Sequence, residues 1–319
     1  MYNLINNIFQ YILGFFFNSL NDIYLFKFLI SQSFKHFIIH TKMLFVIFFK
    51  YKINKRYYKN QLICLETLKK NKKSDKLFIF GSGVSLNNIN EKIWGQIRKY
   101  DTIGFNSSFY LQKINFTYYI LRAGQEYNSL TNFNTLANEI KYAKFVVKKI
   151  KKNIYLKKTI FLFSSGISQH FPNLLIGYKL WNFQNHIYQY NTNKFEEYPK
   201  GNLHRGLIHR IGTLIDAITF GYHMNYKEII LVGVDLYDSK YFWAPLGKTV
   251  TFNEKLGKEV FSNITLRGKK VYEPHNTVNN GIIKFLDKWN IYFKQRNIKL
   301  FIANPRSLLN EVLPIFKFK

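Results

Sequence analysis

Glu228-Ile229-Ile230-Leu231-Val232-Gly233-Val234-Asp235 is the stretch that decides the fold of this chain. It is apolar at almost every position and does not alternate between a buried and a solvated face. A strand of this kind is buried on both faces, which is typical of the centre of a parallel sheet.

Shorter apolar runs elsewhere predict further strands: Leu77–Phe80, Thr102–Phe105, Tyr118–Leu121, Phe145–Val147, Thr159–Phe163 and Lys299–Ala303. Residues 213–224 and 278–296 predict helices, the second from one apolar stripe at helical spacing. Strands that alternate with helices predict an α/β fold with a Rossmann-like, doubly wound and mostly parallel sheet. In such folds ligands bind outside the carboxyl ends of the strands.

The first 75 residues differ from the rest of the chain. Apolar clusters at residues 12–17 and 43–49 are interrupted by polar side chains, and neither reaches the ~20 apolar residues of a membrane span. Basic residues accumulate from Lys50 to Lys73. A helical, aromatic-rich segment with such cations suits an anionic membrane surface, and a helical subdomain that packs on the main domain or on a partner explains it equally well. We expect a helical N-terminal segment, residues 1–75, and a main domain, residues 76–319.

The formal net charge of +29 attracts polyanions: nucleic acid, anionic lipid or phosphate-bearing substrates. No zinc-finger, helix-turn-helix or RNP-like pattern accompanies it, so we expect no specific nucleic acid partner. Cys64 is the single cysteine, which excludes an intrachain disulfide and fits a reducing compartment. The start of the chain lacks the features of a signal peptide. We therefore expect a cytoplasmic protein, peripheral on the inner face of the cell membrane.

Two predicted strands end in residues suited to contact a nucleotide. Gly81-Ser82-Gly83-Val84-Ser85 follows the first strand, and its glycines allow the backbone to approach a phosphate closely. A purely structural turn explains this loop as well. Asn106 follows the second strand, where a carboxamide can bind a base or ribose or cap a turn.

Tyrosines follow the central octet. Tyr237 comes two residues after Asp235, and Tyr241 follows shortly. Tyrosine hydroxyls can donate hydrogen bonds to a departing phosphate without a metal, although each belongs to a tyrosine-rich chain. His275 stands three residues after Tyr272 and just before a predicted helix. A histidine can remove a hydroxyl proton near neutral pH, whereas most loop histidines are ordinary surface residues.

In their order along the chain, these segments resemble the bacterial sialyltransferases of glycosyltransferase family 42, over residues 76 to about 310. Gly81–Leu86 matches the family's G-N-G-P-S-L loop, and Asn106 matches the Asn after the family's next strand. Residues 210–213 match its R-I-T-S-G segment, and residues 225–237 match its G-Y-K-E-I…G-I-D-F-Y segment. Tyr272–His275 matches its Y-x-x-H, Phe285-Leu286 matches its F-L-E-K, and residues 304–309 match its P-N-S-L-L ending.

The resemblance implies a variant GT-A fold with a small lid, which we expect within residues 238–274. It implies inverting transfer from a CMP-sugar donor to a glycan acceptor, with no metal or other cofactor. His275 would be the base, and Tyr237, Tyr241, Tyr272 and Arg210 would stabilise the leaving phosphate. The implied donor-binding residues are Gly81, Ser82, Gly83, Ser85, Asn106, Thr213 and Asp235.

Several positions depart from the family pattern. Ser82 and Val84 replace an Asn and a Pro, and Arg122 stands where the family has Asn-Pro after its third strand. A cation there suits a carboxylate or phosphate, so Arg122 joins the donor-binding candidates, and sialic acid or a related acidic 2-keto sugar is expected. A non-catalytic, membrane-associated polysaccharide-assembly protein is the alternative, and a nucleic-acid-binding protein is the third. A homo-oligomer is compatible with the sequence.

Overall fold

The computed structural model of the chain describes residues 34–122, 136–166, 170–193, 195–237, 240–245, 248–253, 258–263 and 276–319. Within these ranges, seven strands form one sheet in the order β11-β8-β1-β2-β3-β4-β5, and every adjacent pair is parallel. The strands are β1 (Lys76–Phe80), β2 (Asp101–Phe105), β3 (Tyr118–Ile120), β4 (Ile160–Ser164), β5 (Ile187–Tyr190), β8 (Glu228–Val232) and β11 (Lys299–Ile302). The predicted doubly wound, parallel sheet is confirmed.

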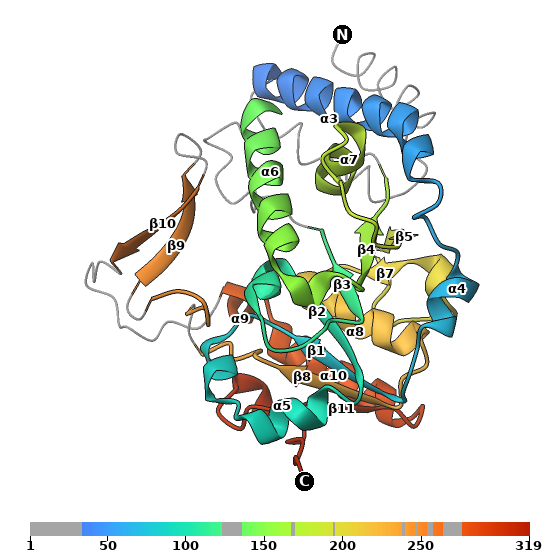
Figure 1. Cartoon of the computed structure of the whole chain (residues 1–319). Helices are drawn as coiled ribbons and strands as arrows, with labels where there is room; N and C mark the ends of the chain where they lie inside the picture. The colour runs from blue at the N-terminus through green and yellow to red at the C-terminus, as the bar shows by residue number, and fades with distance from the viewer. Residues whose placement is uncertain are drawn as a thin grey trace.

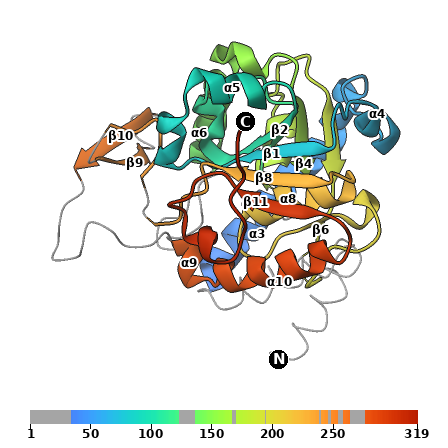
Figure 2. The same ribbon diagram turned by 90° about the horizontal axis from the view of Figure 1, so that it is seen from below.

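Helices cover both faces of this sheet (Figures 1 and 2). Figure 2 shows α5 (Glu91–Ile97) and α6 (Leu136–Lys152) on one side of β1 and β8, with α8 (Thr213–His223) and α10 (Ile282–Lys294) on the other. The short helix α7 (His170–Gly177) packs on the α6 side, since Phe171 and Leu174 share a cluster with Val146. The sheet is therefore a central layer between two helical layers.

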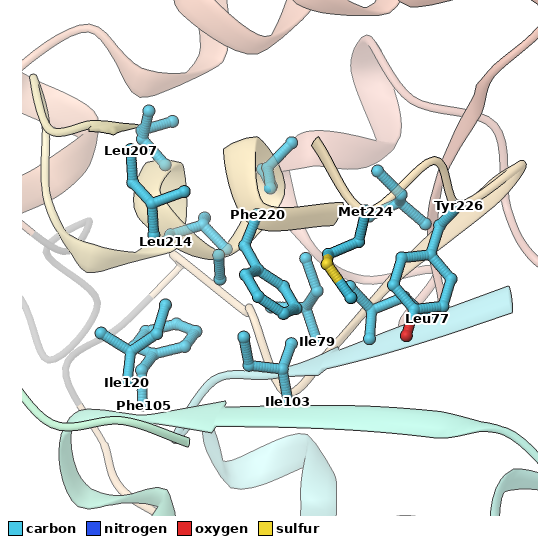
Figure 3. Close-up of a cluster of buried hydrophobic side chains, with 14 of the residues drawn as sticks. Leu77, Ile79, Ile103, Phe105, Ile120, Leu207, Leu214, Phe220, Met224 and Tyr226 are labelled. Carbon is cyan, nitrogen blue, oxygen red and sulfur yellow. The ribbon is translucent and has the colours of Figure 1, made fainter. Parts of the chain in front are cut away.

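Alternate residues of each strand enter the two layers, which explains why the strands are apolar throughout. In β1, Leu77 and Ile79 face the α8 side, where they meet Phe220 in the cluster of Figure 3, while Phe78 and Phe80 belong to the opposite cluster. Each of these β1 side chains is at most 1 % exposed. Burial of one such side chain contributes about 1.5–3 kcal/mol to stability.

One face of the N-terminal helix α3 (Phe34–Asn54) packs on α7. Ile47 is fully buried there, and the Asn54 side chain donates to the Gly177 carbonyl at 2.7 Å. The Gln189 side chain in β5 donates to the Tyr51 hydroxyl at 2.8 Å. In the described part of the N-terminal segment, one face of the helix is therefore joined to the main core.

Three sequence predictions need correction. The strand predicted at Phe145–Val147 is wrong, because these residues lie in α6, whose buried residues Ala143, Val146 and Ile150 recur at helical spacing. The predicted helix 278–296 is divided into α9 (Asn276–Asn279) and α10, with Gly281 between them at φ +83°. The central octet ends as a strand at Val232, and Gly233, at φ +65°, begins the turn.

Shorter elements complete the described fold: α4 (Leu65–Lys70), β6 (Thr192–Asn193) paired with β7 (Leu207–Ile208), and β9 (Lys248–Asn253) paired antiparallel with β10 (Lys258–Asn263). The 3-10 helices are η1 (Lys55–Tyr58), η2 (Val84–Asn88), η3 (Asn106–Tyr110), η4 (Ile154–Leu156), η5 (Leu203–Arg205) and η6 (Leu308–Glu311). The β9–β10 hairpin lies in the segment where we expected a lid. Within the described ranges, no helix is both long and apolar enough to cross a bilayer.

The core assignment predicts different effects for two apolar residues of α10. Leu286 is fully buried, whereas Ile291 is 55 % exposed. Leu286→Ala should lower the free energy of unfolding by about 2–5 kcal/mol, because it removes buried surface and leaves a cavity. Ile291→Ala should change it by less than about 0.5 kcal/mol. Urea titration followed by circular dichroism measures both, and equal effects would contradict the burial of this face.

Candidate functional site

The strand order reverses direction between β1 and β8. From β1 the chain proceeds outward through β2, β3 and β4 to β5, and it then returns to β8 and β11 on the other side of β1. The chain after β1 therefore leads to α5 on one face of the sheet, and the chain after β8 leads to α10 on the other face. In open parallel sheets this is where ligands bind, outside the carboxyl ends of the strands.

The loop after β1 lies directly against the backbone after β8. Gly81 N–H donates to the Val232 carbonyl and Gly83 N–H to the Gly233 carbonyl, both at 2.8 Å. A Cβ at Gly81 would overlap the Gly233 carbonyl, and one at Gly83 would overlap the Asp235 carboxylate. The two glycines are thus required by the close approach of two protein segments.

Asp235 connects the ends of three strands. Its carboxylate accepts hydrogen bonds from the Ser85 N–H at 2.9 Å, the Ser85 hydroxyl at 2.5 Å and the Asn304 side chain at 2.7 Å. Asp235 is only 3 % exposed, and its carbonyl accepts from the Leu308 N–H at 3.2 Å. The side chain expected to bind the donor therefore holds the loops after β1, β8 and β11 in place.

The segment with Tyr241 covers the same loop. Tyr241 forms an antiparallel bridge with Gly83, and the Phe242 N–H donates to the Ser82 carbonyl at 3.2 Å. The Tyr241 ring stacks on Trp243 with centroids 4.5 Å apart, and Trp243 stacks in turn on Tyr110. The structure thus brings the predicted tyrosine beside the predicted glycine loop, although they are far apart in sequence.

Asn106 and Tyr237 lie at the same edge. Asn106 follows β2, next to β1 in the sheet, and it is exposed with a left-handed φ of +50°. A left-handed backbone is uncommon in residues other than glycine, and the residues that adopt it are concentrated at functional sites. Tyr237 is half-buried and follows Leu236, which is also left-handed at φ +65°.

Arg122 follows β3 and participates in a buried cluster that the sequence did not reveal. Its Nη1 donates to the Asp216 carboxylate at 3.2 Å and to the Thr192 hydroxyl at 3.1 Å. Asp216 also contacts His209 Nδ1, at 2.8 Å. The only hint in the sequence was one carboxylate within an otherwise apolar helical stretch.

The remaining predicted residues fall into two groups. Arg210 and Thr213 lie at the start of α8; Thr213 is buried, whereas Arg210 is exposed and its guanidinium lies 5.8 Å from the Phe285 ring. Tyr272 and His275 lie outside the described residues. Among the residues that the structure describes, no three His, Cys, Asp or Glu side chains are grouped as metal ligands.

No family model matches the sequence, and no curated protein matches it. Among solved structures, the chain is similar to the monofunctional alpha-2,3-sialyltransferase Cst-I from Campylobacter jejuni, with a TM-score of 0.41 and 13% sequence identity. The similarity covers 81% of this chain and 85% of that chain.

The contact between Gly83 and Asp235 predicts opposite effects of adding a methyl group at two glycines. Gly83→Ala should lower the free energy of unfolding by about 1–3 kcal/mol, because the new Cβ overlaps the buried carboxylate. Gly95→Ala in α5 meets no atom within 4 Å and should raise stability by about 0.5–1 kcal/mol. Thermal and urea unfolding measure both variants. A neutral effect of Gly83→Ala would show that the two loops are not packed as described.

Proposed function

We propose that this chain is an inverting glycosyltransferase that moves sialic acid or a related acidic 2-keto sugar from a CMP-sugar to a surface glycan acceptor. One observation carries the proposal. Segments that resemble family 42 sialyltransferases, and that are spread over more than a hundred residues, lie at the carboxyl ends of β1, β2 and β8. Gly81–Ser85 contacts Asp235 and Tyr241, Asn106 follows β2, and Tyr237 follows shortly after β8.

The nucleotide would lie along the carboxyl edge between the loop after β1 and Asn106. The loop's contact with β8 holds its backbone in one conformation, so Ser82 and Ser85 can contribute at fixed positions. In this proposal Asp235 shapes the donor site, since its carboxylate already accepts three hydrogen bonds from the protein. On the α8 side of the site, further contacts to the donor would come from Arg122, Arg210 and Thr213.

The proposed reaction is a direct displacement. His275 takes the proton of the acceptor hydroxyl as its oxygen attacks the anomeric carbon. Tyr237, Tyr241 and Tyr272, together with Arg210, stabilise the charge of the departing CMP phosphate. These side chains supply the charge stabilisation that a divalent ion gives in other transferases, so the proposed reaction needs no metal or cofactor.

CMP binding and CMP release test this proposal. CMP should raise the melting temperature, because a ligand that binds only the folded protein stabilises it, while UMP and GDP should not. With a panel of CMP-sugars, the wild type should release CMP in the presence of EDTA. His275→Ala should reduce release by at least about 10²–10⁴-fold while CMP still raises its melting temperature.

His204→Ala, which changes an exposed histidine of η5, is the control and should keep full activity. Full activity of His275→Ala would refute the base assignment. A strict need for added divalent ion would refute the metal-free mechanism.

The outer face of α3 supports a partner proposal. Val46, Phe49, Ile53 and Tyr57, which continue from α3 into η1 at helical spacing, are 44%, 54%, 59% and 57% exposed. Exposed cations flank this stripe: Lys42, Lys50, Lys52, Arg56 and Lys59. An apolar stripe bordered by cations fits the interface of an anionic bilayer. The protein would then be peripheral on the inner face of the cell membrane.

Vesicle binding tests this surface. The double variant Phe49→Gln/Ile53→Gln should bind phosphatidylglycerol vesicles at least about tenfold more weakly than the wild type, because two apolar side chains no longer enter the bilayer. Ile291→Gln, equally exposed on α10, is the matched control and should bind as the wild type does. If the double variant changes only the oligomeric state in gel filtration, the stripe is a protein interface and the membrane proposal is wrong.

A further inference from the structure

The buried carboxylate of Asp216 lies at the centre of a second polar cluster. Asp216 is in the first turn of α8 and has no exposed surface. One carboxylate oxygen contacts His209 Nδ1 at 2.8 Å. The other accepts from Arg122 Nη1 at 3.2 Å and from the Tyr190 hydroxyl at 3.4 Å. A buried carboxylate requires such partners, since an unpaired charge away from water is strongly unfavourable.

This cluster lies at the carboxyl edge of the sheet. Arg122 follows β3, and Tyr190 is the last residue of β5. His209 follows β7, and its N–H donates to the Asn193 carbonyl at 2.8 Å. The first turn of α8 lies at the same ends of the strands, because Asp216 in that turn contacts Arg122 after β3 and Tyr190 at the end of β5. The cluster is therefore on the edge that carries the switch-point site.

The arrangement orients the imidazole of His209. Its Nδ1 side is turned toward the buried Asp216, while 22% of the side chain remains exposed. A carboxylate that accepts from Nδ1–H fixes the orientation of the ring, so that Nε2 is turned away from Asp216 and is the nitrogen left to transfer a proton. Burial raises the pKa of Tyr190, so this hydroxyl stays protonated and remains a donor to Asp216.

The charges around His209 favour an anion. Arg122 balances the charge of Asp216, and the neighbouring Arg210 is an exposed cation. Helix α8 begins after Gly212, which provides no side-chain cap, and a Cβ at Gly212 would meet nothing within 4 Å. The positive end of the helix dipole adds to the same field.

A role limited to structure leaves part of this geometry unexplained. The Arg122–Asp216 pair and the Tyr190 hydroxyl already connect α8 to β3 and β5. A histidine adds what these contacts lack: a partly exposed ring nitrogen that can donate or accept a proton. The same pairing of a partly exposed imidazole with a buried carboxylate is the arrangement by which proteins orient a proton-transfer residue.

We propose that His209, oriented by Asp216, is the catalytic proton donor to the leaving phosphate, an inference that rests on the function proposed above. As the acceptor oxygen bonds to the anomeric carbon, the bond from that carbon to the phosphate oxygen breaks. Its electron pair stays on the phosphate oxygen, which takes the proton from His209 Nε2. The acceptor proton goes to His275, and His209 is protonated again from solvent.

The variant His209→Asn tests the inference, because its carboxamide N–H can replace Nδ1–H toward Asp216 but cannot transfer a proton. We expect a melting temperature and a CMP-induced shift like those of the wild type, with kcat for the CMP-sugar lowered about 10²–10⁴-fold. The profile of kcat against pH should differ between the wild type and the variant, because only the wild type carries the imidazole as proton donor.

Asp216→Asn tests the positioning role. Here kcat should fall while KM for the donor is unchanged, because the carboxylate acts on the imidazolium and not on the bound donor. If this variant does not fold, His209→Asn alone decides. His204→Asn is the matched control, since His204 is exposed and five residues away, and it should behave as the wild type.

The outcomes separate the two proposals. If the wild type is active and His209→Asn is equally active, the proton-donor role is overturned and the transferase function stands. The same holds if the profile of kcat against pH is the same in both proteins. A variant that loses stability or CMP binding shows a structural role and also overturns it. A wild type that releases CMP from no donor in the panel overturns both.

Discussion

The approach of the loop after β1 to the backbone after β8 is the constraint on which the candidate site depends. Two main-chain hydrogen bonds, from Gly81 and Gly83, set the distance between the segments. The Asp235 carboxylate then occupies the space that a side chain at position 83 would need. Since Asp235 also binds Ser85 and Asn304, the ends of β1, β8 and β11 are held as one unit.

Burial of the sheet on both faces makes this arrangement rigid. Each strand sends alternate side chains into two separate apolar clusters, so a strand cannot shift without exposing both. The loops at the carboxyl edge are consequently supported by a stiff layer. Polar groups at this edge can then be held at defined positions, as the Asp235 and Asp216 carboxylates both are.

Local pattern predicted most of the sheet because parallel, doubly buried strands are apolar along their whole length. It was wrong at Phe145–Val147, where three apolar letters in a row belong to a helical stripe whose other members, Ala143 and Ile150, lie outside the run. Local pattern also missed the break at Gly281. The left-handed backbone of this glycine divides the single helix that was predicted at residues 278–296.

The sequence by itself determined the fold class, the carboxyl-edge loops and the basic N-terminal helix, because hydrophobic period and charge are local properties. It also indicated the order of segments that resembles a sialyltransferase. Only the tertiary structure decided which residues meet. Ser85 and Asp235 are 150 positions apart, and Arg122 and Asp216 are 94 apart. No local pattern encodes such contacts, since strand order and helix packing bring them together.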